Sequence, residues 1–195
     1  MYETITDPYC YPNTSILINK AGNRNQKELD RFELSMSINR FSEPLPSGRF
    51  SVNHYRFIHH HLFQDVYPWA GKIRNIRISK SGSMFCYPEN IKRELTKVFD
   101  SLRLSNHLTG LEQNDFVIAA AHVLAELNAI HAFRDGNGRV QLAFLALLSF
   151  KAGHQLNFTQ LNPGLFLKCM IESFKGNEVD LVQQIKNILQ SENSS

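Results

Sequence analysis

The sequence predicts a mainly α fold, a helical bundle with one short β-hairpin, on three observations. Apolar residues recur at helical spacing along most of the chain. The stretch KIRNIRISKSGSMFCYP instead carries apolar residues at a period of two on both sides of a Lys-Ser-Gly-Ser turn, which is typical of a hairpin. The stretch LAFLALLSF is apolar on every side, as expected for a helix at the centre of a bundle. Because no internal repeat divides the 195 residues, we expect residues 1–195 to form a single domain.

The first half of the chain is expected to begin with an irregular arm over residues 1–25, which contains several Pro, Asn and Gly residues. Helical spacing follows in QKELDRFELSMSINRF and resumes at Ser51, after a loop rich in Pro and Ser. The predicted hairpin occupies residues 73–88. Another helix is expected from about Ile91 to Leu104.

The second half is expected to be organised around a helix–loop–helix unit at residues 113–153. An apolar stripe that includes Phe116, Leu124 and Ile130 predicts the first helix of this unit. The second helix is expected to end at Gly153, because glycine is the usual residue just past a helix C-terminus. Two more helices, in NPGLFLKCMIESFKGN and EVDLVQQIKNILQ, are expected to close the bundle.

The composition argues against several classes of protein. The formal net charge is +3 and no long Lys/Arg run is present, so we expect no nucleic-acid partner; an RNA-binding helical domain would depend on that charge alone. The three cysteines form no C-x-x-C pair, which argues against a disulfide framework or a structural zinc site. With no signal peptide and no apolar stretch near the ~20 residues of a membrane span, we expect a cytoplasmic protein without a membrane partner.

The stretch HAFRDGNGR, residues 131–139, places polar residues directly before the most apolar helix of the chain. Gly136 and Gly138 let successive backbone N–H groups converge on one point, and the helix start adds the positive end of its dipole. Phosphate is the natural occupant of such a site, and Arg139 can hold phosphate oxygens. The alternative is a simple helix–helix turn, capped by His131 and Asp135.

Two side chains of this stretch have the chemistry for a reaction at a bound phosphate. Asp135 beside phosphates would be a ligand for Mg²⁺, which takes one or two carboxylates together with phosphate oxygens. Histidine titrates near neutral pH, so His131 can accept a proton from a nucleophile. Together with the glycines and the arginine, they predict a site for phosphoryl or nucleotidyl transfer. The Walker pattern GxxxxGK[ST] is absent from the sequence.

The same stretch resembles the motif of Fic-domain proteins, usually HPFxx-GNGR with Asp or Glu before the first glycine; here Ala132 replaces the proline. IHHHLFQDVYPWAGKIR resembles the family's stretch before the hairpin, and DPYCYPNTSILINKAG resembles the arm of Fic domains in bacterial type IV secretion effectors and related toxins. The resemblance covers most of residues 7–190. It implies a Fic-type helical bundle that transfers AMP from ATP to a Ser, Thr or Tyr hydroxyl of a target protein. It also implies residence in a host cell if the chain is part of an effector.

By this resemblance, His131 deprotonates the target hydroxyl and Asp135 binds Mg²⁺. Phe133 points into the core and fixes the loop. The phosphates of the nucleotide are held by four consecutive residues: Gly136, Asn137, Gly138 and Arg139. The hairpin acts as a flap that pins the target segment by strand addition, through Ser79, Lys80, Ser81, Gly82, Ser83, Met84 and Phe85.

One position departs from the family pattern. Active members commonly carry a second arginine three residues after the first, where this chain has Leu142. Residues i and i+3 share a helix face, so Leu142 would lie beside Arg139 without the charge-assisted contact of ~1.5–3 kcal/mol that an arginine offers. The alternative function is therefore a Fic-like module with weakened or altered activity, which uses another nucleotide or phosphate donor or only binds.

The resemblance also bears on regulation. In the family, an inhibitory helix often carries the pattern Ser/Thr-x-x-x-Glu-Gly/Asn, and its glutamate pairs with the second arginine. This chain has no match to that pattern, so self-inhibition is not expected. A separate inhibitor protein is compatible with the sequence, although its glutamate would lack the usual partner at Leu142.

Two clusters outside the motif also have alternative interpretations. Adjacent helical residues point about 100° apart, so the three histidines at residues 59–61 cannot converge on one metal ion. We interpret them as a helix face with one packed histidine. The hairpin region is basic, because it contains Arg74, Arg77 and Lys80. These side chains are either a solvated face of the strand or a positive surface that attracts nucleotide or an acidic target.

Overall fold

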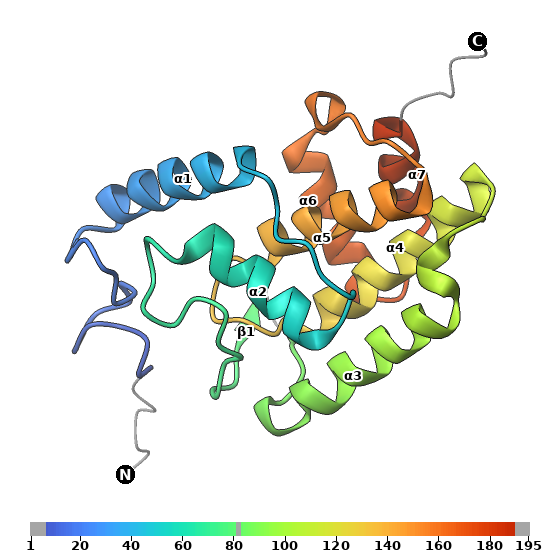
Figure 1. The fold of residues 1–195 in the computed structure, drawn as a ribbon. Coiled ribbons are helices and arrows are strands. Elements are labelled where there is room, and N and C mark those ends of the chain that lie inside the picture. Colours follow the sequence, from blue (N-terminus) through green and yellow to red (C-terminus); the bar gives the residue numbers. More distant parts are fainter. Residues whose placement is uncertain (1–6, 81–82, 190–195) are drawn as a thin grey trace.

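The computed structural model describes residues 7–80 and 83–189 and confirms the mainly α fold (Figure 1). Within these ranges the chain forms α1 (Gln26–Ser42), α2 (Val52–Phe63), α3 (Pro88–Leu104), α4 (Gln113–Ile130), α5 (Asn137–Ala152), α6 (Pro163–Phe174) and α7 (Val179–Ile188). Two short 3-10 turns are η1 (Asn106–Leu108) and η2 (Phe158–Gln160). The helices predicted in the sequence are all present.

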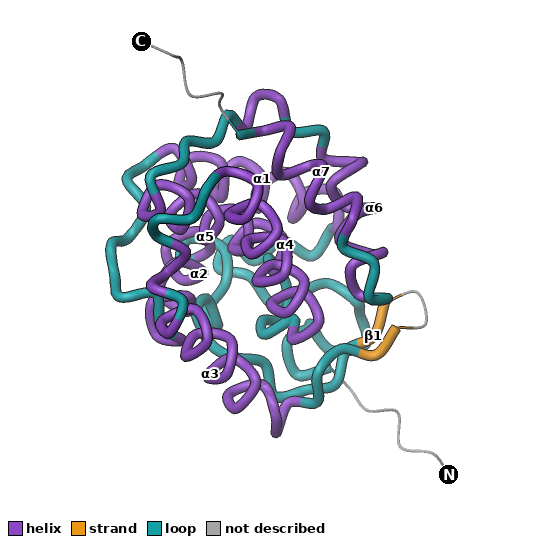
Figure 2. The backbone as a smooth tube through the Cα atoms, turned by 90° about the vertical axis from the view of Figure 1, so that its right-hand side faces the viewer, coloured by secondary structure: helices purple, strands orange, loops and turns teal. Residues whose placement is uncertain are grey.

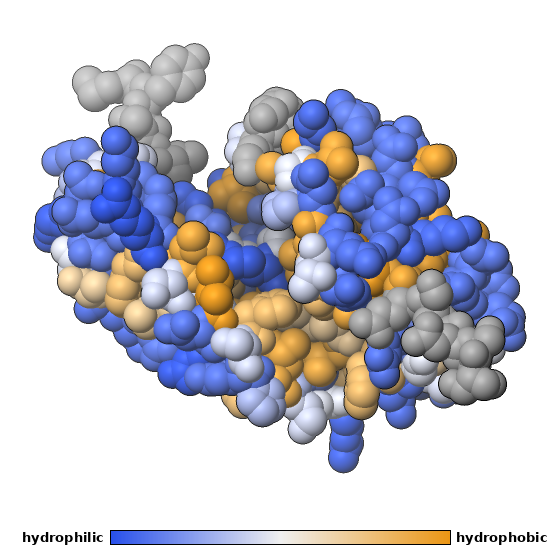
Figure 3. Space-filling model, turned by 90° about the horizontal axis from the view of Figure 1, so that it is seen from above, coloured by the Kyte–Doolittle hydropathy of each residue, from blue (hydrophilic) through white to orange (hydrophobic). Residues whose placement is uncertain are grey.

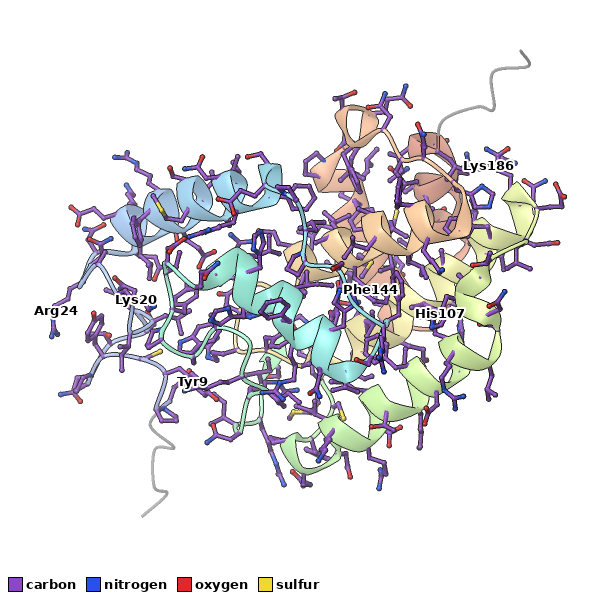
Figure 4. The ribbon with its side chains drawn as sticks, in the orientation of Figure 1. Tyr9, Lys20, Arg24, His107, Phe144 and Lys186 are labelled. Carbon is purple, nitrogen blue, oxygen red and sulfur yellow. The ribbon has the colours of Figure 1, made fainter. Side chains whose placement is uncertain are left out.

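The helix–loop–helix unit formed by α4 and α5 lies at the centre of the bundle. α4 packs against α3, α5, α6 and α7, while α2 covers α5, and α1 packs in turn on α2 (Figure 1). The labelled Phe144 of α5 points into the interior (Figure 4), where its ring contacts those of Tyr55 and Phe99. α5 thus has neighbours on most of its surface, which explains why its sequence lacks a polar face.

Local signals set the helix ends where the sequence places them. The side chain of Asn25 accepts hydrogen bonds from the first turn of α1, and that of Ser51 does the same for α2. Pro163 opens α6 directly after its cap Asn162. Gly153, with φ 90°, ends α5 as predicted.

The β-hairpin is shorter than the expected range 73–88. β1 (Ser79–Lys80) pairs antiparallel with β2 (Ser83–Met84), in the register Ser79↔Met84 and Lys80↔Ser83. The arms of the hairpin leave the ladder because their backbone donors bond elsewhere: Arg74 N–H to the Ala132 carbonyl (3.0 Å) and Cys86 N–H to the Ala129 carbonyl (3.1 Å). The base of the hairpin is therefore joined to the end of α4 rather than extended as sheet.

The hairpin lies at the edge of the molecule, beside the end of α6 (Figure 2). Phe85, which follows β2, contacts the ring of Phe174 at a centroid distance of 5.4 Å. Two of the residues proposed for the flap, Ser81 and Gly82, lie outside the described residues. The side chain of Met84 is half exposed.

The described part of the N-terminal arm, residues 7–25, contains turns but no helix or paired strand, and it packs across the loop after α2. Cys10 and Leu17 form an isolated antiparallel bridge, and Lys20 N–H bonds to the carbonyl of Val66 at 2.8 Å. Seen from above, the molecule is hollowed between its α1 and α6 sides, and hydrophobic residues border the hollow (Figure 3). None of the helices in the described ranges has the length and hydropathy needed to cross a bilayer.

Candidate active site

His131 directly follows α4 and has a left-handed backbone, with φ 48° and ψ 62°. Its N–H bonds to the carbonyl of Leu127 (3.0 Å), so it ends the helix as a C-cap. Its imidazole stacks on the ring of Phe85, with centroids 3.8 Å apart and planes 16° from parallel. A left-handed histidine costs backbone energy of about 1–2 kcal/mol, and such strain is typical of functional positions.

The loop after His131 is closed by the side chain of Asn137. Its Oδ1 accepts from the N–H of Phe133 (3.0 Å) and its Nδ2 donates to the carbonyl of the same residue (2.8 Å). The ring of Phe133 is fully buried, as expected. Because the side chain of Asn137 is bonded inward, it is not free to bind a ligand, and only its backbone N–H could serve the anion site that the sequence predicts.

His59 supports the loop from α2. Its Nδ1 accepts from the N–H of Gly71 (2.9 Å), and its Nε2 donates to the carbonyl of Asp135 (3.0 Å). The ring is fully buried and stacks on Phe133 at 3.8 Å. Burial lowers the pKa of His59 to about 3, so the ring is neutral at physiological pH. It is the one fully packed histidine of the three; its bond to the motif loop was not predicted.

The two glycines of the motif have different surroundings. Gly136 has φ 77°, and a Cβ built on it would lie 2.4 Å from ring carbons of Phe63. Gly138 is exposed, and a Cβ there would meet nothing within 4 Å. Gly136 is thus required by the fold. Gly138 leaves open space above the first turn of α5, where the N–H groups have no carbonyl acceptor within the helix.

A pocket of about 690 Å³ brings His131 and Asp135 to one surface, together with the hairpin. The lining residues come from the arm, the hairpin region and the motif loop; they are Asp7, Asn75, Ile76, Arg77, Ile78, Ser79, Phe85, His131, Arg134 and Asp135. Arg134 also pairs with Asp7, whose Oδ2 accepts from its Nη2 at 2.7 Å. The volume falls within the range of small-molecule sites.

Asp135 fits the donor set that Mg²⁺ requires. Its Oδ1 accepts from the N–H of Gly136 at 2.5 Å, which fixes the carboxylate at the start of α5. The described part of the chain contains no group of three His, Cys, Asp or Glu side chains that could hold a metal. A single carboxylate completed by phosphate oxygens is the arrangement that Mg²⁺ commonly adopts with nucleotides.

Arg139 is held by α1. Its Nη2 pairs with Glu33, its Nη1 donates to Ser37 Oγ at 2.9 Å, and its guanidinium lies 4.6 Å from the ring centre of Phe63. Glu33 also accepts from the hydroxyl of Tyr67. A phosphate that binds Arg139 would have to share the guanidinium with Glu33 or displace Glu33 from it. No sequence pattern had indicated a role for Glu33.

Leu142 is partly buried and packs against the hydrophobic core. An arginine at this position would have to turn its side chain out of that contact to reach a phosphate. Leu142, which replaces the second arginine of the family pattern, therefore has a packing role in this chain.

The basic hairpin region does not form a uniform charged face. Arg77 is exposed, and its guanidinium lies 4.4 Å from the ring centre of Tyr87. Arg74 is only 1% exposed, so it is neither a solvated strand residue nor a surface charge that attracts ligands. Both interpretations offered for Arg74 are wrong, because the residue turns inward to bond backbone carbonyls.

The fold and the loop together define a class: a helical-bundle protein in which a histidine and a carboxylate lie beside a glycine-containing helix start. Residues 49–149 match the family model described as Fic/DOC family. The chain is 46% identical over 189 residues to "Probable protein adenylyltransferase y4lH" of Sinorhizobium fredii, across 96% of this chain and 98% of the relative. The chain belongs to the Fic/DOC family.

Two further relatives agree with this assignment. Protein adenylyltransferase VbhT of Bartonella schoenbuchensis is 36% identical over 90% of this chain, which spans 37% of that protein. Among solved structures, the N-terminal Fic domain of a VirB-translocated Bep effector protein from Bartonella quintana, with bound ADP, is similar with a TM-score of 0.87. It is 28% identical, and the match covers 95% of this chain and 96% of that one.

We predict that Gly136→Ala destabilises the protein while Gly138→Ala does not. At Gly136 the new methyl group would meet Phe63 and the backbone would keep an unfavourable positive φ, at a combined cost of about 2–5 kcal/mol. The measurement is urea unfolding of both variants. Equal midpoints for the two variants would show that the contact with Phe63 does not restrict the loop.

We predict that His59 makes folding stability pH-dependent. Its folded pKa of about 3 lies below the ordinary value of 6.5, so the unfolded chain binds the extra proton between these values. Its contribution is present above pH 6.5 and is lost as pH falls toward 3, with a slope of up to about 1.4 kcal/mol per pH unit. Urea unfolding from pH 7 to 4 should show a shallower slope for His59→Gln than for the wild type.

The control for this prediction is His60→Gln. His60 is the next residue of α2 but is exposed, so its replacement should leave the wild-type slope unchanged. A slope that changes equally in both variants would contradict the assignment to His59.

Proposed function

We propose that this chain is a protein adenylyltransferase that transfers AMP from ATP to a Ser, Thr or Tyr hydroxyl of a target protein, with His131 as general base. The observation that carries the proposal is that His131 and Asp135 face one pocket beside the start of α5. The names of the relatives as adenylyltransferases support the same reaction.

In the proposed reaction, the imidazole of His131 accepts the proton of the target hydroxyl. The hydroxyl oxygen then forms a bond to the α-phosphorus of ATP, the bond from that phosphorus to its bridging oxygen breaks, and pyrophosphate leaves. The stacking of the imidazole on Phe85 restricts its orientation, so the base is positioned before substrate binds. Positioning of this kind lowers the entropic part of the barrier.

The start of α5 would stabilise the charge of the phosphates. The backbone N–H groups of Asn137, Gly138 and Arg139 belong to its first turn, and open space lies above Gly138. Asp135 would hold Mg²⁺ against the phosphate oxygens, and the ion would neutralise part of their charge. Arg139 would bind the β- or γ-phosphate in exchange for part of its contact with Glu33.

The hairpin would bind the target segment. Ser79 and Phe85 line the same pocket as His131, so a strand added to the edge of β1 would pass close to the base. Main-chain bonds of this type place an extended peptide without demanding a particular sequence. In this proposal Lys80 and Ser81–Met84 serve the same flap.

The test uses the purified chain with α-labelled ATP, Mg²⁺ and a cell lysate. Wild-type protein should label specific bands. His131→Ala should abolish the labelling but keep ATP affinity within about twofold, because the imidazole acts in the chemical step. Gly138→Ala should weaken ATP binding at least tenfold, since its methyl group would occupy the space above the first turn of α5.

Each result has a distinct meaning. Labelling that persists in His131→Ala would exclude the residue as the base. Full ATP affinity in Gly138→Ala would exclude the first turn of α5 as the phosphate site. No labelling from any nucleotide by the wild type would refute the transferase proposal.

A second candidate function is a Fic-like module with weakened or altered activity, and the partly buried Leu142 favours it. We predict that Leu142→Arg raises ATP affinity and labelling by about one to two orders of magnitude, because it restores a charge-assisted phosphate contact. Isothermal titration with ATP, alongside GTP and CTP, measures the change. If GTP or CTP binds and ATP does not, the nucleotide donor is not ATP. An ATP affinity that is unchanged in Leu142→Arg would show that the pocket does not place a phosphate beside residue 142.

A further inference from the structure

Arg74 is the largest of the fully buried side chains in the part of the chain that the structure describes. It follows the loop after α2 and precedes the hairpin. Its backbone N–H donates to the carbonyl of Ala132 at 3.0 Å, so the main chain at this point already contacts the motif loop.

Within the described residues, the guanidinium of Arg74 donates to four backbone carbonyls, and these carbonyls belong to two separate elements. At the end of α4, Nε donates to His131 O (2.8 Å) and Nη2 to Ile130 O (3.3 Å). On the two arms of the hairpin, Nη1 donates to Ile76 O (2.5 Å) and Nη2 to Cys86 O (2.6 Å). One planar side chain therefore joins the hairpin to the end of α4.

A buried cation needs compensation. Within residues 7–80 and 83–189, no carboxylate lies within salt-bridge distance of Arg74. The last carbonyls of α4 carry the negative end of the helix dipole and have no donors within the helix, so they provide both charge and hydrogen-bond acceptors. An apolar side chain of similar size would fill the space but would leave these carbonyls unsatisfied.

The end of α4 and the hairpin, which Arg74 joins, also contact each other at the imidazole of His131. His131 is held in its left-handed conformation with its carbonyl bonded to Arg74 Nε. Cys86, whose carbonyl bonds to Nη2, directly follows Phe85, and the Phe85 ring stacks on His131. The main chain on each side of the stack is thus fixed by the same guanidinium.

We propose that Arg74 is a positioning residue that holds the imidazole of His131 in register with the hairpin. It acts through backbone carbonyls and does not touch the reacting atoms. The proposal rests on the proposed transferase function, in which the base and the target strand must be aligned. A misplacement of about 1 Å can cost on the order of 100-fold in rate.

The experiment compares Arg74→Lys, which keeps a positive charge but lacks the planar fork, with Arg93→Lys, an exposed substitution on α3. Nuclear magnetic resonance of the purified chain measures the ring-current shift that Phe85 causes at His131 and the hydrogen exchange of the Cys86 amide. Arg74→Lys should reduce the shift and accelerate exchange at least tenfold. Labelling from α-labelled ATP should slow by about 100-fold, with ATP affinity within twofold of wild type.

The outcomes separate this proposal from the proposed function. An unchanged His131 shift and Cys86 exchange in folded Arg74→Lys would overturn the positioning role. So would a changed shift with an unchanged labelling rate. If the wild type labels nothing, the transferase proposal fails, while the spectroscopic comparison still decides whether Arg74 orients His131. Arg93→Lys should match the wild type throughout.

A second variant is available in case Arg74→Lys does not fold. Phe85→Leu keeps apolar contact with Phe174 but removes the stack on His131. It should slow labelling while leaving ATP affinity unchanged, and a wild-type rate would overturn the proposal. In wild-type protein, the Nε–H of Arg74 should exchange at least 100-fold more slowly than that of exposed Arg93. Equal rates would show that the guanidinium is not held by the carbonyls.

Discussion

A short loop joins the C-terminus of α4 at Ile130 to the N-terminus of α5 at Asn137 inside a hydrophobic bundle. The last carbonyls of α4 and the first N–H groups of α5 have no partners within their helices, so both sets need other hydrogen-bond partners. The carbonyls at the end of α4 receive donors from Arg74, and the loop between the helices is closed by Asn137 on Phe133 and by His59 on Asp135. All of these donors and acceptors belong to the protein itself, so these backbone groups need no ligand as a partner. The backbone N–H groups of the first turn of α5, in contrast, lie beside the open space above Gly138. This open space is where the proposed function places the phosphates of the nucleotide.

The protein supports this loop with two groups that are costly to bury. His59 is kept neutral, and its two ring nitrogens serve as one acceptor and one donor. Arg74 is charged, but it meets the negative end of a helix dipole and several carbonyls. Each group satisfies backbone atoms that would otherwise be buried without partners, and such atoms cost about 1–3 kcal/mol each. Stability and site geometry therefore depend on the same contacts.

The sequence predicted the helices well, because their spacing and caps are local signals. The bounds of α4 and the glycine at the end of α5 required no knowledge of tertiary contacts. The motif loop was predicted from its residue order and from its family resemblance. The partners of the loop could not be predicted: Arg74 lies 57 positions from His131, and Glu33 lies 106 positions from Arg139. Periodicity identifies the buried face of an element but does not identify which distant carbonyl or carboxylate lies against it. For His59, the sequence indicated one packed histidine and gave no sign of its bond to Asp135.

The hairpin is anchored at its base and not along its length. Its two arms are tied to the end of α4 at Arg74 and Cys86. Between these anchors, the strand pairing is short: it joins Ser79–Lys80 to Ser83–Met84, with one more bond from the Phe85 N–H to the Ile78 carbonyl (3.3 Å). Replacement of residues 79–84 therefore leaves in place the bonds of Arg74 and Cys86 and the stack of Phe85 on His131. Under the proposed function, this separates two tasks for protein engineering: the peptide preference of the hairpin could be redesigned by exchange of this short segment, while the residues around His131 stay unaltered. The same separation would allow closely related chains to diverge in their recipients while they retain a common chemistry.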